Sequence, residues 1–191
     1  MNLANRITII RITMIPLFML CFYFYSNVAS SEQAPIWNTM SYVLTVFLFV
    51  LAAGTDKLDG YVARKYNQIT NLGKLLDPLA DKLLISAALI MMAEAGMVPG
   101  WMAVIIIGRE FAITALRMAA SGRGIALAAD QFGKIKMVLQ VIAITAVLLH
   151  NFPFSMFTTF PVDQALLVAA TFVTLLSGCN YIIRNLSYFK N

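Results

Sequence analysis

Residues 56–81 read DKLDGYVARKYNQITNLGKLLDPLAD, and this stretch decides the fold. It places four aspartates between two strongly apolar segments, 37–54 and 83–97. A charged side chain at the bilayer centre costs about 2.5–3.5 kcal/mol on insertion scales. Carboxylates this close together also repel one another unless cations neutralise them. The stretch therefore predicts a functional cation site at the edge of a membrane.

The composition around this stretch is that of an integral membrane protein. Of 191 residues, 60% are hydrophobic and 12% are charged, against about 25% charged in soluble domains. Several apolar segments approach the ~20 residues that span a bilayer. The third and fifth are shorter, but the polar segments 72–82 and 131–136 precede them and are expected to continue the same helices. We predict an all-α membrane protein with six transmembrane helices in a single domain, 1–191. The apolar segments are 7–25, 37–54, 83–97, 101–119, 137–150 and 164–183.

The lysines and arginines indicate the topology. All 14 lie near the N-terminus, between segments two and three, between the start of segment four and segment five, or after segment six. The alternate connections, around 26–36, 94–100 and 151–163, have none. The positive-inside rule then places both termini and the four aspartates in the cytosol. It also accounts for the net charge of +5, so we expect no nucleic-acid partner.

Cysteine and histidine usage limits the chemistry. Cys21 and Cys179 both fall inside apolar segments, which favours small core residues over a disulfide. His150 is the one histidine, so a His-rich metal site within one chain is excluded. The topology places His150 on the side of the membrane opposite the aspartates.

The aspartates repeat with helical spacing. Asp56 and Asp59 share one helix face, as do Asp77 and Asp81. Two helices joined by about eight residues can be antiparallel neighbours, so the two acidic faces can converge. Such a group of carboxylates suits a pair of hard divalent cations, Mg²⁺ or Mn²⁺. Small residues on the same faces leave room for a bulky ligand: Gly60, Ala63 and Gly73.

These groups together suit a pyrophosphate. Arg64 can donate two hydrogen bonds to a phosphate, and two metals about 3.5–4 Å apart can clamp an in-line phosphoryl transfer. Because the stretch offers no covalent nucleophile, direct attack by an acceptor hydroxyl is favoured, with Asp81 as the base. Two alternatives remain. One is a solvated loop with salt bridges to nearby lysines, and the other is a divalent-cation transport site.

The spacing D-x2-D-G-x2-A-R-x8-G-x3-D-x3-D resembles the signature of the CDP-alcohol phosphotransferase family. The resemblance implies a six-helix membrane homodimer with a polar cavity facing the cytosol. It implies that Asp56, Asp59, Asp77 and Asp81 hold two Mg²⁺ ions and that Asp81 is also the base. The short element Asn5-x-x-Thr8 is similar to one that closes over the nucleotide, although an ordinary helix cap also fits it. The other positions implied to contact CDP are Asp59, Gly60, Ala63, Arg64, Thr70 and Gly73.

A second stretch is similar to bacterial members of the family whose acceptor is glycerol 3-phosphate. It comprises 108–111, Arg117, 128–130 and 133–136, and its basic residues are predicted on the cytosolic side. A phosphate on the acceptor needs such a basic pocket, although the same residues also fit positive-inside anchors. Glu110 would either orient Arg109 or offset its charge. The basic residues are Arg109, Arg117, Lys134 and Lys136.

The expected activity follows from this resemblance. It is transfer of the phosphatidyl group from CDP-diacylglycerol to sn-glycerol 3-phosphate, giving phosphatidylglycerophosphate and CMP, at a bacterial plasma membrane. The same chemistry with serine or inositol phosphate as acceptor is the nearest alternative.

Overall fold

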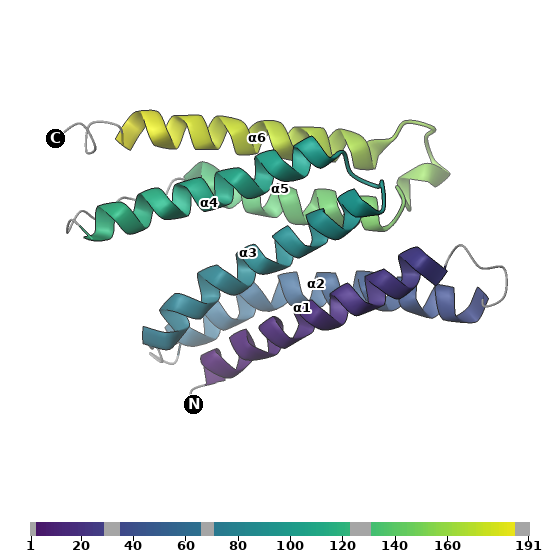
Figure 1. Ribbon diagram of the computed structural model, residues 1–191, viewed down its shortest axis with the longest axis horizontal. Coiled ribbons are helices and arrows are strands. Elements are labelled where there is room, and N and C mark those ends of the chain that lie inside the picture. Colours follow the sequence, from purple (N-terminus) through teal and green to yellow (C-terminus); the bar gives the residue numbers. More distant parts are fainter. Residues whose placement is uncertain (1–2, 29–34, 66–70, 123–130, 186–191) are drawn as a thin grey trace. The chain divides into compact units, whose positions relative to one another are not determined.

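The structure is a computed structural model that describes residues 3–28, 35–65, 71–122 and 131–185. These residues form an all-α fold (Figure 1), which confirms the all-α part of the predicted fold class. Helices α3 and α5 begin at Asn71 and Gln131, so the polar segments 72–82 and 131–136 do continue into the apolar helices. The elements are α1 Leu3–Val28, α2 Pro35–Lys65, α3 Asn71–Glu94, α4 Gly100–Gly122, α5 Gln131–Leu148, the short 3₁₀ helix η1 Phe154–Met156 and α6 Val162–Asn185.

The chain divides into two compact units. Unit 1 is Met1–Met97 and contains α1, α2 and α3, whereas unit 2 is Val98–Asn191 and contains α4, α5, η1 and α6. Cys21 belongs to unit 1 and Cys179 to unit 2, and both are free thiols. Cys179 is exposed and Cys21 is only partly buried, so the prediction that both are core residues is wrong, because each lies off the packed face of its helix.

In unit 1, α1 and α2 are antiparallel. Aromatic rings meet at Tyr25–Tyr42, with centroids 5.4 Å apart, and at Phe18–Phe49, with centroids 5.9 Å apart. Residues later in α2 therefore contact residues earlier in α1. Helix α3 packs against both of these helices. The phenylalanines between α1 and α2 are fully buried, so this part of the unit is an aromatic core.

A left-handed glycine marks the end of α3. The helix ends at Glu94, and Gly96 has φ +72°. The amide of Met97 donates to the carbonyl of Met92 at 2.9 Å, which satisfies one of the last helical carbonyls. A residue with a side chain is strained at this φ, so glycine is the expected cap. The helix therefore stops slightly before the end of the predicted apolar segment, 83–97.

In unit 2, α6 packs against both α4 and α5. The turn before α6 is fixed by Asn151, whose Nδ2 donates to the Phe160 carbonyl at 3.1 Å and whose Oδ1 accepts from the Asp163 amide at 3.2 Å. The buried stripe of α6 is rich in small and hydroxylic residues. Its members are Asp163, Leu167, Ala170, Thr171, Thr174, Ser177, Gly178 and Tyr181.

Within the described residues, two helical stretches are long and apolar enough to cross a membrane, Thr8–Asn27 and Val162–Asn185. The apolar stretches Thr39–Thr55 and Ile135–Leu148 are shorter. Helix α2 has 31 residues, which at 1.5 Å each is about 46 Å, compared with about 30 Å for the hydrocarbon core of a bilayer. Its acidic end, after Thr55, thus lies beyond its apolar stretch.

Candidate active site

The first two aspartates continue the buried face of α2. Thr45, Phe49 and Ala52 are buried at helical spacing. At 3.6 residues per turn, positions 56 and 59 follow on the same stripe. The side chains of Asp56 and Asp59 lie outside the described residues, so the helix register alone places these positions. The register puts them on the interior side of α2.

The second pair continues the buried face of α3 in the same way. Leu84, Ala88 and Met92 are buried, and positions 77 and 81 precede them at spacings of three or four residues. The side chains of Asp77 and Asp81 also lie outside the described residues. All four acidic positions therefore occupy faces that are buried where α2 and α3 are apolar.

The two acidic pairs belong to the same end of unit 1. Helix α2 ends at Lys65 and α3 begins at Asn71. Asp59 and Asp77 are each six positions from this connection, about 9 Å along their helices. The aspartates therefore lie on two successive helices, as predicted, with five residues between the helices instead of the eight expected. The other predicted CDP positions Gly60, Ala63 and Arg64 are on α2 and Gly73 is on α3, whereas Thr70 lies outside the described residues.

The N-terminal element lies at this end as well. Along the antiparallel pair of helices, residue 25 of α1 contacts residue 42 of α2, residue 18 contacts residue 49, and residue 11 contacts residue 55. One helical turn further, Thr8 is level with about residue 59 of α2. Thr8 is buried, whereas the side chain of Asn5 lies outside the described residues. Because α1 begins at Leu3, both residues are within the helix and not at its cap.

Arg11 lies beside the acidic positions, which its sequence pattern did not predict. It is fully buried, and its Nε donates to Thr55 Oγ1 at 3.3 Å, one residue before Asp56. The contact with Thr55 places this positive charge beside the start of the acidic face. Because burying a cation is costly unless it is paired or hydrogen-bonded, nearby carboxylates would help to stabilise it. In the charge pattern, Arg11 is only one of the residues that indicate the topology. Its spacing from Thr8 and Phe18, which puts all three on one helix stripe, was the available sign of burial.

The donor set at these positions fits hard divalent cations. Carboxylate oxygens are the ligands that Mg²⁺ and Mn²⁺ prefer, and the four acidic positions share interior faces at one end of unit 1. Among the side chains that the structure describes, no three His, Cys, Asp or Glu residues gather. The four aspartates are not among those side chains, so a metal there stays a prediction.

In unit 2, Glu110 joins two of the predicted basic residues. Its Oε1 is 3.5 Å from Arg109 Nη1 and forms an ion pair with Lys136 Nζ. The side chains are mostly buried, with 12% of Arg109, 14% of Glu110 and 6% of Lys136 exposed. Glu110 therefore offsets charge on both cations and is not dedicated to Arg109. The side chain of Lys134 lies outside the described residues.

The two arginines of α4 both contact α6. Arg109 Nη2 donates to Ser177 Oγ at 2.8 Å, and Arg117 Nε donates to Tyr181 Oη at 3.0 Å. The guanidinium carbon of Arg117 also lies 5.2 Å from the centroid of the Tyr181 ring. This confirms that Arg109 and Arg117 share one face of their helix. Neither α6 partner was singled out from the sequence.

The cluster of Arg109, Arg117, Lys136 and Glu110 carries an excess of two positive charges, counted over these described side chains. That excess complements a dianionic phosphate monoester. His150 is 14 positions beyond Lys136 at the far end of α5, roughly 20 Å along the helix axis. The predicted placement of His150 across the membrane from the aspartates stays a prediction.

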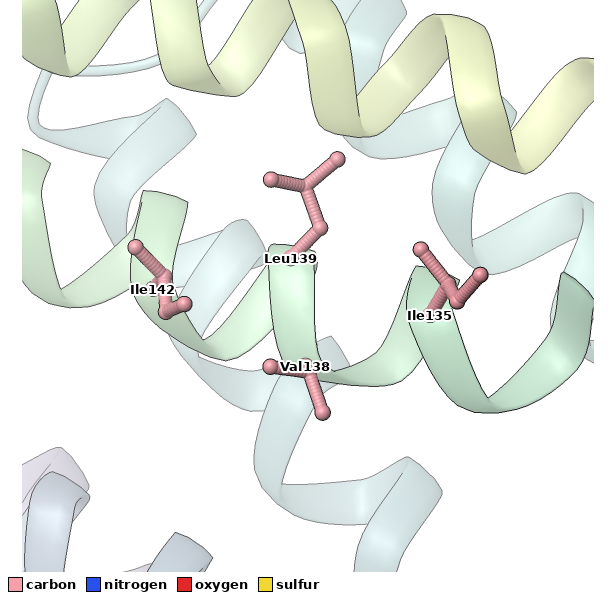
Figure 2. Close-up of a pocket in the computed structure, with 4 residues that line it drawn as sticks. All are labelled: Ile135, Val138, Leu139 and Ile142. Atoms are coloured by element: carbon pink, nitrogen blue, oxygen red, sulfur yellow. The ribbon is translucent and has the colours of Figure 1, made fainter.

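A shallow apolar depression also lies along α5 (Figure 2). It is lined by Ile135, Val138, Leu139 and Ile142. The helix register places this stripe on the side of α5 away from the buried Lys136. Aliphatic side chains offer no acid, base or metal ligand, so the depression is not part of the candidate site.

Comparison with known proteins decides the family. A family model described as CDP-alcohol phosphatidyltransferase matches residues 1–176, which include α1 to α5 and most of α6. The chain belongs to the CDP-alcohol phosphatidyltransferase family. This family is an integral membrane one and is generally metal-dependent, in line with the acidic faces of α2 and α3.

Two full-length relatives in the CDP-alcohol phosphatidyltransferase family carry the same name, CDP-diacylglycerol–glycerol-3-phosphate 3-phosphatidyltransferase. The Bacillus subtilis protein is 44% identical over 189 residues, which is 99% of this chain and 97% of the relative. The Rickettsia felis protein is 35% identical over 188 residues, covering 98% and 97%. The similarity therefore includes both compact units.

Proposed function

We propose that this chain transfers the phosphatidyl group from CDP-diacylglycerol to sn-glycerol 3-phosphate, giving phosphatidylglycerophosphate and CMP. The observation that carries the choice of acceptor is the basic cluster in unit 2, whose excess positive charge complements a dianionic phosphate. The names of the full-length relatives support the same acceptor. Serine has no such group and would gain nothing from the cluster, whereas inositol phosphate has one, so the names of the relatives are what favour glycerol 3-phosphate over it.

The donor substrate is assigned to unit 1. The four aspartates would hold two Mg²⁺ ions, or Mn²⁺ in their place. When bound, such ions neutralise charge on the pyrophosphate and on the departing phosphate. Arg64 would donate hydrogen bonds to the pyrophosphate, and small residues would let the nucleotide approach the helix backbone. The CDP contacts proposed are Asn5, Thr8, Asp59, Gly60, Ala63, Arg64, Thr70 and Gly73.

The reaction is a direct displacement at the phosphorus that carries diacylglycerol. Asp81 accepts the proton of the C1 hydroxyl of glycerol 3-phosphate. The hydroxyl oxygen forms a bond to this phosphorus as the bond to the bridging oxygen breaks. The bridging oxygen keeps the electron pair and leaves as part of CMP, with Arg64 as a hydrogen-bond donor. No covalent enzyme intermediate is needed.

The acceptor phosphate is assigned to the basic residues of unit 2. Arg109 and Arg117 offer planar groups that can each donate two hydrogen bonds to phosphate oxygens. Lys136 adds a compact charge, and Lys134 is proposed to add a second. Binding the phosphate away from the reacting hydroxyl would orient the acceptor, which lowers the barrier by restricting its motion.

The membrane setting is part of the proposal. We infer six transmembrane helices with cytosolic termini, a polar cavity facing the cytosol and a homodimer in a bacterial plasma membrane. The positive-inside distribution of all lysines and arginines supports this orientation. Both units would act as one domain, with the acyl chains of the lipid substrate remaining in the bilayer.

The test is CMP release by purified protein given CDP-diacylglycerol, Mg²⁺ and one alcohol at a time. We expect release with glycerol 3-phosphate and much less with serine or inositol phosphate. Release with serine or inositol phosphate alone would overturn the acceptor. If no alcohol gave CMP but vesicles containing the protein showed divalent-cation flux, the enzyme assignment would be wrong and the transporter correct.

A further inference from the structure

The C-terminal part of α6 contacts both arginines that are proposed to bind the acceptor phosphate. Ser177 and Tyr181 are buried and accept hydrogen bonds from Arg109 and Arg117. The ring of Tyr181 adds a cation–π contact to Arg117. Hydroxyl groups buried in an otherwise apolar helix are costly unless they form hydrogen bonds. Here both hydroxyl oxygens accept hydrogen bonds from guanidinium groups.

We propose that Ser177 and Tyr181 are positioning residues that hold Arg109 and Arg117 ready for the acceptor phosphate. The inference rests on the proposed function, because it concerns the same phosphate. An arginine side chain loses much rotamer freedom when it binds a ligand. If α6 has already fixed both guanidinium groups, the phosphate meets a prepared site and binding costs less.

The two contacts act on different properties of the arginines. Ser177 fixes the terminal Nη2 of Arg109, a side chain that is already mostly buried. Arg117 is more exposed, so the Tyr181 ring beneath its guanidinium group is what restrains it. The Nε atom of Arg117 is used for Tyr181, which leaves its two terminal nitrogens to donate to a phosphate.

Gly178 gives a second, independent sign that Arg109 is held closely. A Cβ atom built on Gly178 would lie 3.0 Å from Arg109 Cγ. This contact is near the start of the arginine side chain and cannot be relieved by moving its far end alone. Glycine at 178 therefore permits the approach of Arg109 to α6, and alanine there should displace the guanidinium group.

A matched control lies on the same stripe of α6. Thr171 is buried, and its hydroxyl donates to the Leu167 carbonyl of its own helix at 2.8 Å. Thr171→Val therefore removes a buried hydroxyl from the same helix while both arginine contacts remain. A general loosening of α6 would affect this variant and Ser177→Ala alike.

The experiment measures kcat and both KM values for the full chain in detergent micelles. We expect Ser177→Ala and Gly178→Ala to raise the KM for glycerol 3-phosphate about 2- to 13-fold, the cost of ordering one arginine side chain on binding. The inhibition constant of inorganic phosphate should rise in parallel. The KM for CDP-diacylglycerol and kcat should stay within about twofold. Ser177→Thr, which keeps the hydroxyl, should recover most of the loss.

Two substitutions of Tyr181 separate its hydrogen bond to Arg117 from its cation–π contact. Tyr181→Phe removes only the hydroxyl, and Tyr181→Leu removes the ring as well. The KM for glycerol 3-phosphate should rise in the order wild type, Phe, Leu. Phe changes little volume, so it tests the proposal even if Ser177→Ala does not fold. Unchanged acceptor KM values in all variants, or equal changes in kcat and both KM values shared by Thr171→Val, would overturn the inference. Failure of the proposed function would instead appear in the wild type, as no CMP release with glycerol 3-phosphate.

Discussion

Glu110→Gln should destabilise the protein in a way that phosphate reverses. The substitution keeps the shape and one acceptor oxygen of the side chain but removes the carboxylate charge paired with Lys136. Breaking a buried ion pair by removing one partner costs about 3–5 kcal/mol. Because 14% of the Glu110 side chain remains exposed and glutamine still accepts a hydrogen bond, we expect the lower end, about 3 kcal/mol.

The sign of the ligand effect follows from the charge of the cluster. Without the carboxylate, the excess over the described side chains of the cluster rises from two positive charges to three. A dianionic phosphate should then bind the variant more tightly than the wild type. A ligand at 100 times its Kd adds about 2.7 kcal/mol of stability, so saturating phosphate should restore most of the loss. Lys136→Met in the same chain should also restore stability, but at the expense of acceptor binding.

The assay is thermal unfolding in detergent, with and without glycerol 3-phosphate or inorganic phosphate. Glu94→Gln is the control, because Glu94 is exposed at the end of α3 and should leave the midpoint unchanged. A Glu110→Gln protein as stable as the wild type without phosphate would refute the buried pair. Equal stabilisation of both proteins by phosphate would refute the assignment of this cluster to the acceptor.

Three further predictions concern unit 1. Asp81→Asn should lower kcat by at least the 10²–10⁴-fold typical of losing a general base, while calorimetry still detects binding of CDP-diacylglycerol; normal turnover would mean another base. Chelation by EDTA should abolish CMP release, and Mg²⁺ or Mn²⁺ should restore it; activity that persists in EDTA would contradict the proposed role of the aspartates. Arg11→Met should lower the free energy of unfolding by about 1–3 kcal/mol, measured by denaturant titration, with a smaller loss for Thr55→Val. An Arg11→Met protein as stable as the wild type would show that the buried guanidinium contributes nothing net.

Much of the fold follows from hydropathy and helix periodicity. Four of the apolar segments lie wholly within helices, while 83–97 and 137–150 run three and two residues past the ends of α3 and α5. Asn71 and Gln131 begin α3 and α5 where the polar extensions were predicted. The spacing of Asp77 and Asp81 gave their shared face, since helical register is a local property. The register of buried Leu84 then showed that this face is an interior one, which spacing alone does not tell.

Other features depend on which helices touch, and local patterns do not report this. Arg11 has the same place in the charge pattern as an arginine at the membrane surface, yet it is buried against Thr55. Ser177 and Tyr181 are common residues in a membrane helix, and their role appears only when Arg109 is found beside Ser177 and Arg117 beside Tyr181. Both features depend on the tertiary structure, because each is defined by a contact between two helices.

The charges are divided unequally between the two units, and this bears on how acceptor choice could vary. Unit 1 has seven Lys or Arg and six Asp or Glu, whereas unit 2 has seven and three. The family signature, with the proposed metal and CDP positions, lies wholly in unit 1. Unit 2 has an excess of four positive charges. It contains the proposed acceptor-binding residues and the α6 side chains that hold them. With the proposed roles, substitutions on α4, α5 and α6 change the acceptor while the chemistry at the aspartates stays the same. Replacing Ser177 and Arg109 together should then abolish the use of glycerol 3-phosphate without loss of CDP-diacylglycerol binding.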